Sequence, residues 1–113
     1  MTNVAVIGAG LIGRAWAIVF ARAGFSVTLW DQFPQQTTQA LTFIADRLPE
    51  LRAAGLLADE PATVMARIQP MASLWETVRD AAYVQECGPE RTDVKIGVFT
   101  ELERAARPDS VLA

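Results

Sequence analysis

Three glycines near the N-terminus have the types and spacing of a phosphate-binding turn. Gly8, Gly10 and Gly13 stand in a Gly-Ala-Gly-Leu-Ile-Gly run, after a short apolar segment and before a longer helical pattern. In such a run the first glycine permits a tight turn off a strand, and the second lets a pyrophosphate approach the backbone. The third lets the following helix pack closely on the strands, and the free N–H groups of that helix then face the phosphates. The run predicts a dinucleotide-binding turn.

An acidic residue further along indicates which dinucleotide this is. Asp31 stands at the end of the next predicted strand, where a carboxylate accepts both hydroxyls of an adenine ribose and repels a 2′-phosphate. Gln32 and Phe33 follow it, and neither offers an arginine to receive such a phosphate. NAD is therefore favoured over NADP, with FAD as the alternative that shares the glycine run. The competing interpretation is a plain glycine-rich turn with Asp31 as a helix N-cap. The sequence leaves two roles for Arg14, a contact with a phosphate and a solvated position on the helix surface.

A second group of polar residues follows the fourth predicted strand, in the turn 85–90. Ligands of an open parallel sheet lie across the carboxyl ends of the strands, near the switch in strand order. The first and fourth strands flank that switch, so this turn lies where the nicotinamide half of a dinucleotide arrives. Glu86, Glu90 and Lys95 are the candidate contacts, with a solvated helix start as the alternative. Cys87 has no histidine partner and is interpreted as a small hydrophobic residue.

The sequence contains no histidine and one cysteine. A single cysteine forms neither an intrachain disulfide nor a cysteine-rich metal site, so no metal centre is expected. Dehydrogenases that oxidise a hydroxyl group most often use histidine as the general base. We therefore expect these residues to hold a cofactor without supplying the group that takes the substrate proton.

Composition excludes several classes of partner. The 113 residues are 51% hydrophobic, enough for one compact core, and 20% are charged with a net charge of −3. That balance gives no basic field to attract nucleic acid or an anionic membrane surface. No apolar run approaches the ~20 residues that cross a bilayer. A cytoplasmic protein is the expectation.

Short apolar segments alternate with longer helical patterns, which predicts an α/β fold with a Rossmann-type, doubly wound parallel sheet. The predicted strands are 3–7, 25–30, 66–70, 82–87 and 110–113, and the predicted helices are 13–23, 34–54, a short one from about 59, 73–80 and 92–106. Because a complete doubly wound domain continues beyond a fifth strand, we expect truncation in or near that strand. Residues 1–113 are then the NAD-binding domain of a longer two-domain protein.

The helical patterns also predict which faces are buried. In the first helix the residues expected to face the sheet are Trp16, Val19, Phe20 and Ala23. In the second helix the expected apolar face consists of Leu41, Ile44, Ala45, Leu48 and Leu51. Pro49 predicts a kink or break near Leu48. Gly24 and Gly55 are expected to end the two helices, and Ser73 with Glu76 is expected to begin a later one as a capping box. The long stretch 34–65 is expected to project as an arm.

The two signatures together resemble the NAD-binding domain of the 3-hydroxyacyl-CoA dehydrogenase family. The run VAVIGAGLIGRAWAIVFARAGFSVTLWD at 4–31 is similar to the opening of that family, and QECGPERTDVK at 85–95 to its second signature. The run at 10–17, with Gln-Glu-Cys at 85–87, is most similar to the lambda-crystallin or L-gulonate 3-dehydrogenase branch. The chain departs from the usual pattern at Cys87 and Gly88, where many members have alanine and a branched apolar residue.

The resemblance implies a role for each matching residue. Leu11 and Ile12 would line the pyrophosphate turn, Asp31 would hold the adenine ribose, and Glu90 and Lys95 would contact the nicotinamide-side ribose and its surroundings. The family's catalytic His–Glu pair has no counterpart in these 113 residues. No catalytic residue is therefore assigned here, and these residues alone are expected to be inactive.

The resemblance also implies an activity and partners. The expected activity of the full-length protein is oxidation of a 3-hydroxy group to a ketone, with hydride transfer to NAD. The family's main substrates are 3-hydroxyacyl-CoA thioesters of fatty acid metabolism. A small acid such as L-gulonate or carnitine is the alternative, and so is a crystallin-like protein that binds NAD without catalysis. Relatives usually form homodimers through a C-terminal domain.

Overall fold

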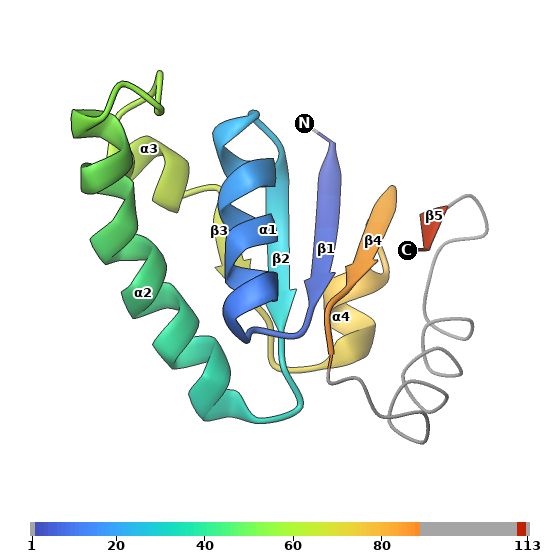
Figure 1. Ribbon diagram of the computed structural model, residues 1–113. Coiled ribbons are helices and arrows are strands. Elements are labelled where there is room, and N and C mark those ends of the chain that lie inside the picture. The colour runs from blue at the N-terminus through green and yellow to red at the C-terminus, as the bar shows by residue number, and fades with distance from the viewer. Residues whose placement is uncertain (1, 89–110, 113) are drawn as a thin grey trace.

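The computed structural model describes residues 2–88 and 111–112, and within them five parallel strands form one sheet (Figure 1). The strands are β1 (Asn3–Ile7), β2 (Ser26–Trp30), β3 (Ile68–Pro70), β4 (Tyr83–Glu86) and β5 (Val111–Leu112). Their spatial order is β3-β2-β1-β4-β5, so the chain moves outward from β1 and then returns to its other side. The α/β fold and a switch in strand order between β1 and β4 are thus confirmed.

The register of the central strands brings three chain segments to one edge. Ile7 of β1 lies beside Trp30 of β2 and beside Glu86 of β4. These residues end their strands, and all three strands point the same way. The residues that follow them, including the glycine run and Asp31, therefore meet at the carboxyl edge of the sheet.

Helices cover both faces of the sheet. On one face lie α1 (Leu11–Arg22), α2 (Pro34–Ala53) and α3 (Pro61–Met65), and on the other lies α4 (Leu74–Val78) (Figure 1). Each face has its own core: Val6, Ala17, Ala21, Val27, Leu29, Ile44, Leu48 and Val64 are buried on the first, and Ala5, Ile7, Val78, Ala81 and Val84 on the second. The predicted helix 92–106 lies outside the described residues.

The buried face of α1 differs from the prediction. Gly13, Ala17 and Ala21 face the sheet, whereas Trp16 and Val19 are 38% and 46% exposed. Residues spaced by four lie on one face of a helix, and small side chains there let the helix approach the strands closely. Trp16 and Val19 therefore lie on the flank of α1 and Ala23 is exposed, whereas Phe20 is partly buried and packs against the core. A hydropathy pattern mispredicts this face because it reflects how apolar the side chains are and not how closely the helix packs.

The second helix is continuous through its internal proline. α2 extends without interruption over 20 residues, so of the kink or break predicted near Leu48 the break does not occur. A proline has no N–H to donate to the carbonyl four residues earlier, here that of Ala45. Ala45 is exposed, which corrects its expected burial and puts the residue with the missing hydrogen bond on the solvent side of α2. The buried residues of α2 are Thr37, Ala40, Ile44 and Leu48, so the stretch packs against the core instead of projecting.

The predicted helix ends are confirmed. Gly24 and Gly55 have φ values of 100° and 77°, the left-handed region that glycine adopts without strain. Each follows the C-cap residue of its helix and donates its N–H to a carbonyl in the last turn. At the start of α4 the Ser73 hydroxyl accepts the backbone N–H of Glu76 at 3.1 Å, as the capping box predicts.

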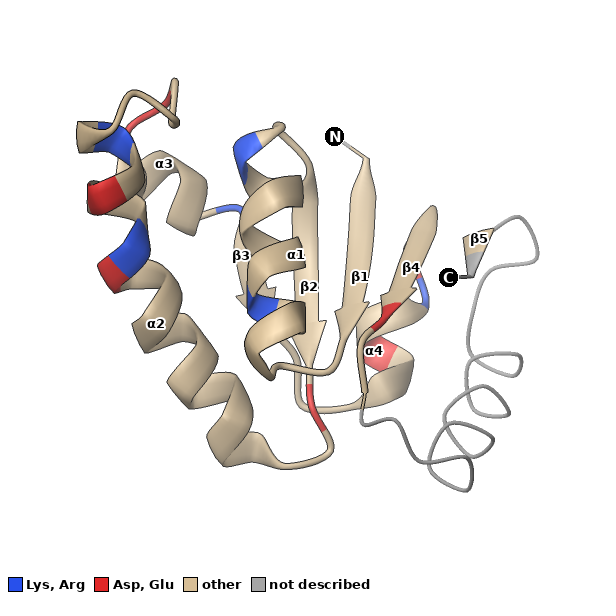
Figure 2. Ribbon diagram, in the orientation of Figure 1, with Lys and Arg blue, Asp and Glu red and all other residues tan. Residues whose placement is uncertain are grey.

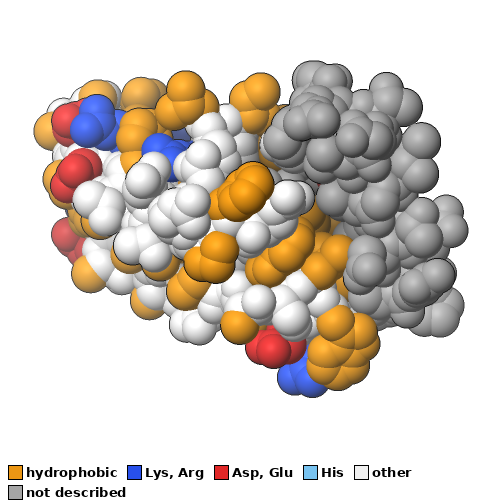
Figure 3. Space-filling view, turned by 90° about the horizontal axis from the view of Figure 1, so that it is seen from below, with side chains coloured by type: hydrophobic (Ala, Val, Ile, Leu, Met, Phe, Trp, Pro, Cys, Tyr) orange, Lys and Arg blue, Asp and Glu red, His pale blue; other side chains and the backbone are white. Residues whose placement is uncertain are grey.

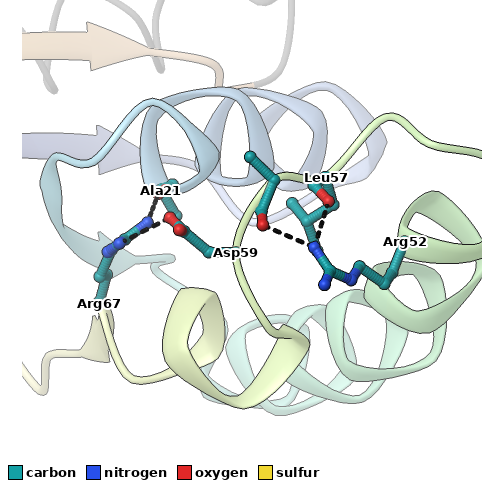
Figure 4. A network of polar contacts seen from close by, with 6 residues as sticks. Ala21, Arg52, Leu57, Asp59 and Arg67 are labelled. Carbon is teal, nitrogen blue, oxygen red and sulfur yellow. Dashed lines mark hydrogen bonds and ion pairs between the residues drawn. The ribbon is translucent and has the colours of Figure 1, made fainter.

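Arginine side chains fasten the connection between α2 and β3 to the rest of the domain (Figure 4). Arg67 donates from Nη1 to the carbonyl oxygen of Ala21 at 2.7 Å and from Nη2 to the Asp59 carboxylate at 2.9 Å. Arg52 donates from Nη1 to the carbonyl oxygen of Leu57 at 3.0 Å. Arg67 therefore joins the C-terminal end of α1 to a loop nearly forty positions further along the chain.

Replacing Arg67 with alanine is expected to lower the free energy of unfolding by roughly 1–2 kcal/mol, because a charge-assisted hydrogen bond to a helix-terminal carbonyl is lost. The midpoint of urea denaturation measures this change. Arg22→Ala is the matched control, since Arg22 is exposed in the last turn of α1. It should change stability by less than about 0.5 kcal/mol. Equal effects of the two variants would contradict the structural role of Arg67.

Candidate functional site

Gly8 connects the glycine turn to both neighbouring strands. Its N–H donates to the carbonyl oxygen of Trp30 at 2.7 Å, and its φ is 106°. A Cβ at this position would lie 2.8 Å from both the carbonyl carbon and the carbonyl oxygen of Cys87. Gly8 is therefore required both by its left-handed backbone and by the segment that follows β4.

The other two glycines have opposite surroundings. A Cβ at Gly13 would lie 1.7 Å from the carbonyl oxygen of Gly8, so the helix start packs directly on the turn. A Cβ at Gly10 would meet no heavy atom within 4 Å. Gly10 thus borders open space while Gly13 is enclosed. This is the difference expected of a turn that packs inward on one side and receives a ligand on the other.

The start of α1 points its free backbone amides toward the same edge. Gly10 is the N-cap and supplies no side-chain acceptor for the first N–H groups of the helix. Leu11 and Ile12, the first two helical residues, are 72% and 66% exposed. Figure 3 looks onto this carboxyl edge of the strands and shows hydrophobic side chains gathered across its middle. An anion placed there meets the positive end of the helix dipole.

The Asp31 carboxylate is bonded to the glycine turn. Its Oδ2 accepts the N–H of Ala9 at 2.8 Å, and its Oδ1 accepts the N–H of Phe33 at 2.8 Å. The N-cap of α2 is Phe33, so the alternative in which Asp31 is a plain helix cap is not what the structure shows. A carboxylate has about four acceptor sites, so each oxygen can still accept a further hydroxyl. Asp31 can therefore hold a ribose beside the turn.

The end of β4 carries a buried carboxylate. Glu86 is 9% exposed, and its Oε1 accepts the N–H of Gly88 at 2.6 Å. A Cβ at Gly88 would lie 2.5 Å from that oxygen and would displace it. A larger residue at position 88, as the family pattern usually has, would therefore require the Glu86 carboxylate to move. Cys87 packs against the core on the α1 face, as expected of a small hydrophobic residue.

Not every predicted site residue falls within the described part of the chain. The structure brings Gly8, Gly10, Gly13 and Asp31 together at one edge, with Leu11 and Ile12 beside them. Glu90 and Lys95 lie outside the described residues. Within residues 2–88 and 111–112, no cluster of three His, Cys, Asp or Glu side chains could hold a metal ion. No helix described is long and apolar enough to cross a bilayer.

Among the described residues, Arg14, Asp31 and Glu86 are charged and lie at the carboxyl edge. Figure 2 shows basic residues on α1 and α2, in the connection between α3 and β3 and just after α4, and acidic residues on α2 and α4, in the loop before α3 and at the carboxyl ends of β2 and β4. The basic residue of the first turn of α1 is Arg14, whose side chain donates to the Ala9 carbonyl oxygen. Sequence reasoning left its role open. A positive charge near a helix N-terminus is the signal that could have marked it, because the helix dipole disfavours it there.

The fold, the enclosed and open glycines and the Asp31 carboxylate define a dinucleotide-binding α/β domain. Comparison with known proteins specifies the class further. Residues 3–113 match the 3-hydroxyacyl-CoA dehydrogenase, NAD binding domain. The chain therefore belongs to the 3-hydroxyacyl-CoA dehydrogenase family, and its cofactor is NAD.

Individual relatives agree with this family. The chain is 39% identical to the lambda-crystallin homolog of Bos taurus, matching 98% of this chain and 35% of that protein. It is 34% identical to the L-carnitine dehydrogenase of Pseudomonas aeruginosa, matching 96% of this chain and 33% of the enzyme. The structure superposes on 3-hydroxybutyryl-CoA dehydrogenase of Escherichia coli with a TM-score of 0.89 and 31% identity, over 98% of this chain and 24% of that one. The chain thus spans about a third of the length of the first two relatives.

Proposed function

We propose that NAD lies across the carboxyl edge of the sheet, with its pyrophosphate over the glycine turn and its adenine ribose on Asp31. The open space at Gly10, the uncapped start of α1 and the acceptor sites of Asp31 support this placement. The nicotinamide half would then point toward the end of β4. The proposed contacts are Gly8, Gly10, Leu11, Ile12, Gly13 and Asp31, with Glu90 and Lys95 on the nicotinamide side.

We propose that the full-length protein oxidises a 3-hydroxy acid to the 3-keto acid. When bound, NAD supplies the hydride acceptor of such a reaction. The residues described hold and orient that cofactor through backbone amides, one carboxylate and the close packing of the turn that its glycines permit. No histidine occurs among the 113 residues, so the usual proton acceptor is not supplied by them.

A small hydroxy acid is the substrate that we favour. A coenzyme A thioester carries phosphates, and the arginines of the stretch from α2 to β3 already bind partners in their own domain. Arg52 donates to two loop carbonyls and pairs with Glu60, and Arg67 donates to Ala21 and pairs with Asp59. Arg47 pairs with Glu50. The relative from Pseudomonas aeruginosa is named an L-carnitine dehydrogenase, which supports a substrate without coenzyme A.

A coenzyme A thioester is the second candidate. The superposition on 3-hydroxybutyryl-CoA dehydrogenase favours it, because that match covers nearly the whole chain. Surface ion pairs contribute little, about 0–1 kcal/mol each, and the Arg47–Glu50 pair is of this kind. Activity measurements must therefore separate the two substrate classes.

The experiment is a screen of the full-length protein against L-carnitine, L-gulonate and 3-hydroxybutyryl-CoA, following NADH formation. A kcat/KM at least ten-fold higher for one of the small acids is the expected result. A preference for the thioester would overturn the small-acid proposal and keep the dehydrogenase class. Bound NAD without turnover of any of the three would favour the non-catalytic alternative. Residues 1–113 alone serve as the control and should bind NAD without turnover.

The family resemblance also supports a homodimer in the cytoplasm as the working form of the full-length protein. Light scattering of the purified protein should give twice the mass of one chain. Cell fractionation should recover the protein with the cytoplasmic contents. A monomer, or recovery elsewhere, would contradict the respective proposal.

A further inference from the structure

Arg14 joins the glycine turn to α2. From the first turn of α1 its Nε donates to the carbonyl oxygen of Ala9 at 2.9 Å, and its Nη2 donates to Oε1 of Gln36 at 3.1 Å. The guanidinium carbon also lies 5.5 Å from the centre of the Phe43 ring, within the range of a cation–π contact. Two hydrogen bonds and an aromatic face thus set the position of this side chain.

Ala9 is held on both of its backbone groups. Its N–H donates to Oδ2 of Asp31 at 2.8 Å, and its carbonyl accepts from Arg14. Because a peptide group is planar and trans, fixing the Ala9 carbonyl also fixes the direction of the Gly10 N–H. Gly10 is the glycine that borders open space. Arg14 therefore determines the orientation of the peptide over which a pyrophosphate would lie.

We propose that Arg14 is a positioning residue for cofactor binding. Its contacts with Gln36 and Phe43 fix the guanidinium, which holds the Ala9–Gly10 peptide in the orientation that binds the pyrophosphate. Arg14 thus acts through the backbone of the turn. This role rests on the proposed placement of NAD over Gly10. It also accounts for a positive charge in the first turn of a helix, where the dipole disfavours one.

The geometry requires arginine rather than any cation. The two acceptors belong to different elements, and the planar guanidinium fork donates to both while stacking on a ring. A lysine ammonium keeps the charge, but it has no planar fork to match this arrangement. Comparing the unmodified protein with Arg14→Lys therefore distinguishes a positioning role of Arg14 from an effect of its charge alone.

The test compares two ligands in the full-length protein. ADP-ribose contains the pyrophosphate, whereas adenosine has the adenine ribose and no phosphate. Arg14→Ala should raise the Kd for ADP-ribose about ten-fold, because a charge-assisted hydrogen bond is lost. It should change the Kd for adenosine less than about two-fold. Arg14→Lys should lose most of the same affinity. Calorimetry measures ADP-ribose, and NMR titration measures the weaker adenosine.

Two further variants complete the design. Arg47→Lys is the matched control, because Arg47 lies 5.1 Å from the centre of the same Phe43 ring but pairs with Glu50, and it should bind ADP-ribose normally. Gln36→Leu removes the acceptor of the Arg14 Nη2 hydrogen bond and should weaken ADP-ribose binding about three-fold. Combined with Arg14→Ala it should add no further loss, since both act on one network.

Several results would overturn the role of Arg14. Equal losses for adenosine and ADP-ribose would indicate a general disturbance of the domain. Wild-type affinity in Arg14→Lys would mean that charge alone matters. Should Arg14→Ala not fold, Arg14→Lys and Gln36→Leu still decide between these outcomes. Absence of ADP-ribose binding to the unmodified protein would overturn the proposed site itself, whereas normal binding with insensitive variants would overturn only the positioning role.

Discussion

Gly10→Val should abolish measurable NAD binding while the domain stays folded. The backbone at Gly10 has φ −74° and ψ −167°, a conformation that any residue adopts, and a Cβ there meets no heavy atom within 4 Å. The valine side chain would instead fill the space proposed for the pyrophosphate. Because such a steric clash acts only on the complex, we expect Kd to rise at least about 100-fold. Calorimetry measures the binding, and urea denaturation measures the fold.

Gly13→Ala is the informative counterpart in the same motif. Its added Cβ would lie 1.7 Å from the carbonyl oxygen of Gly8 and 2.8 Å from the carbonyl carbon, so turn and helix must separate. We expect the free energy of unfolding to fall by more than about 3 kcal/mol. A Gly10→Val protein that still binds NAD normally would show that the cofactor does not pass over this turn. A stable Gly13→Ala protein would contradict the enclosed packing.

Asp31→Arg should weaken NAD binding about 100-fold and shift the preference toward NADP. The variant loses a carboxylate proposed to accept two ribose hydroxyls, and hydrogen bonds to charged groups contribute about 1.5–3 kcal/mol each. It also introduces a cation where a 2′-phosphate would lie. The measured quantities are the Kd values for NAD and NADP, and their ratio is insensitive to general loss of folded protein.

Two controls separate the ribose contact from other effects of this change. Asp46→Arg makes the same charge reversal at an exposed position of α2 and should leave both Kd values unchanged. Asp31→Asn keeps an acceptor for the N–H of Ala9 or Phe33 but removes the charge. It should weaken NAD binding less than Asp31→Arg does. Unchanged NAD affinity in Asp31→Arg would exclude the ribose role.

Local patterns predicted the elements better than the faces they bury. The strand 3–7 and the helix ends at Gly24 and Gly55 were predicted correctly, because each depends on neighbouring residues and their backbone preferences. The buried face of α1 was not, because Ala17 and Ala21 face the sheet and Trp16 does not. A hydropathy pattern measures how apolar a side chain is. How near a helix approaches the sheet depends on how small the side chains between them are.

The site shows the same division. The sequence by itself determined the glycine turn, the acidic residue after the second strand and the NAD class, because these are matters of residue type and order along a βαβ unit. Only the tertiary structure decided that Gly8 packs against the Cys87 carbonyl, that Asp31 is bonded to Ala9 and that Arg14 reaches Gln36. Those contacts join elements far apart in the chain. They depend on strand order and register, which bring the ends of β1, β2 and β4 to one edge and which no local pattern specifies.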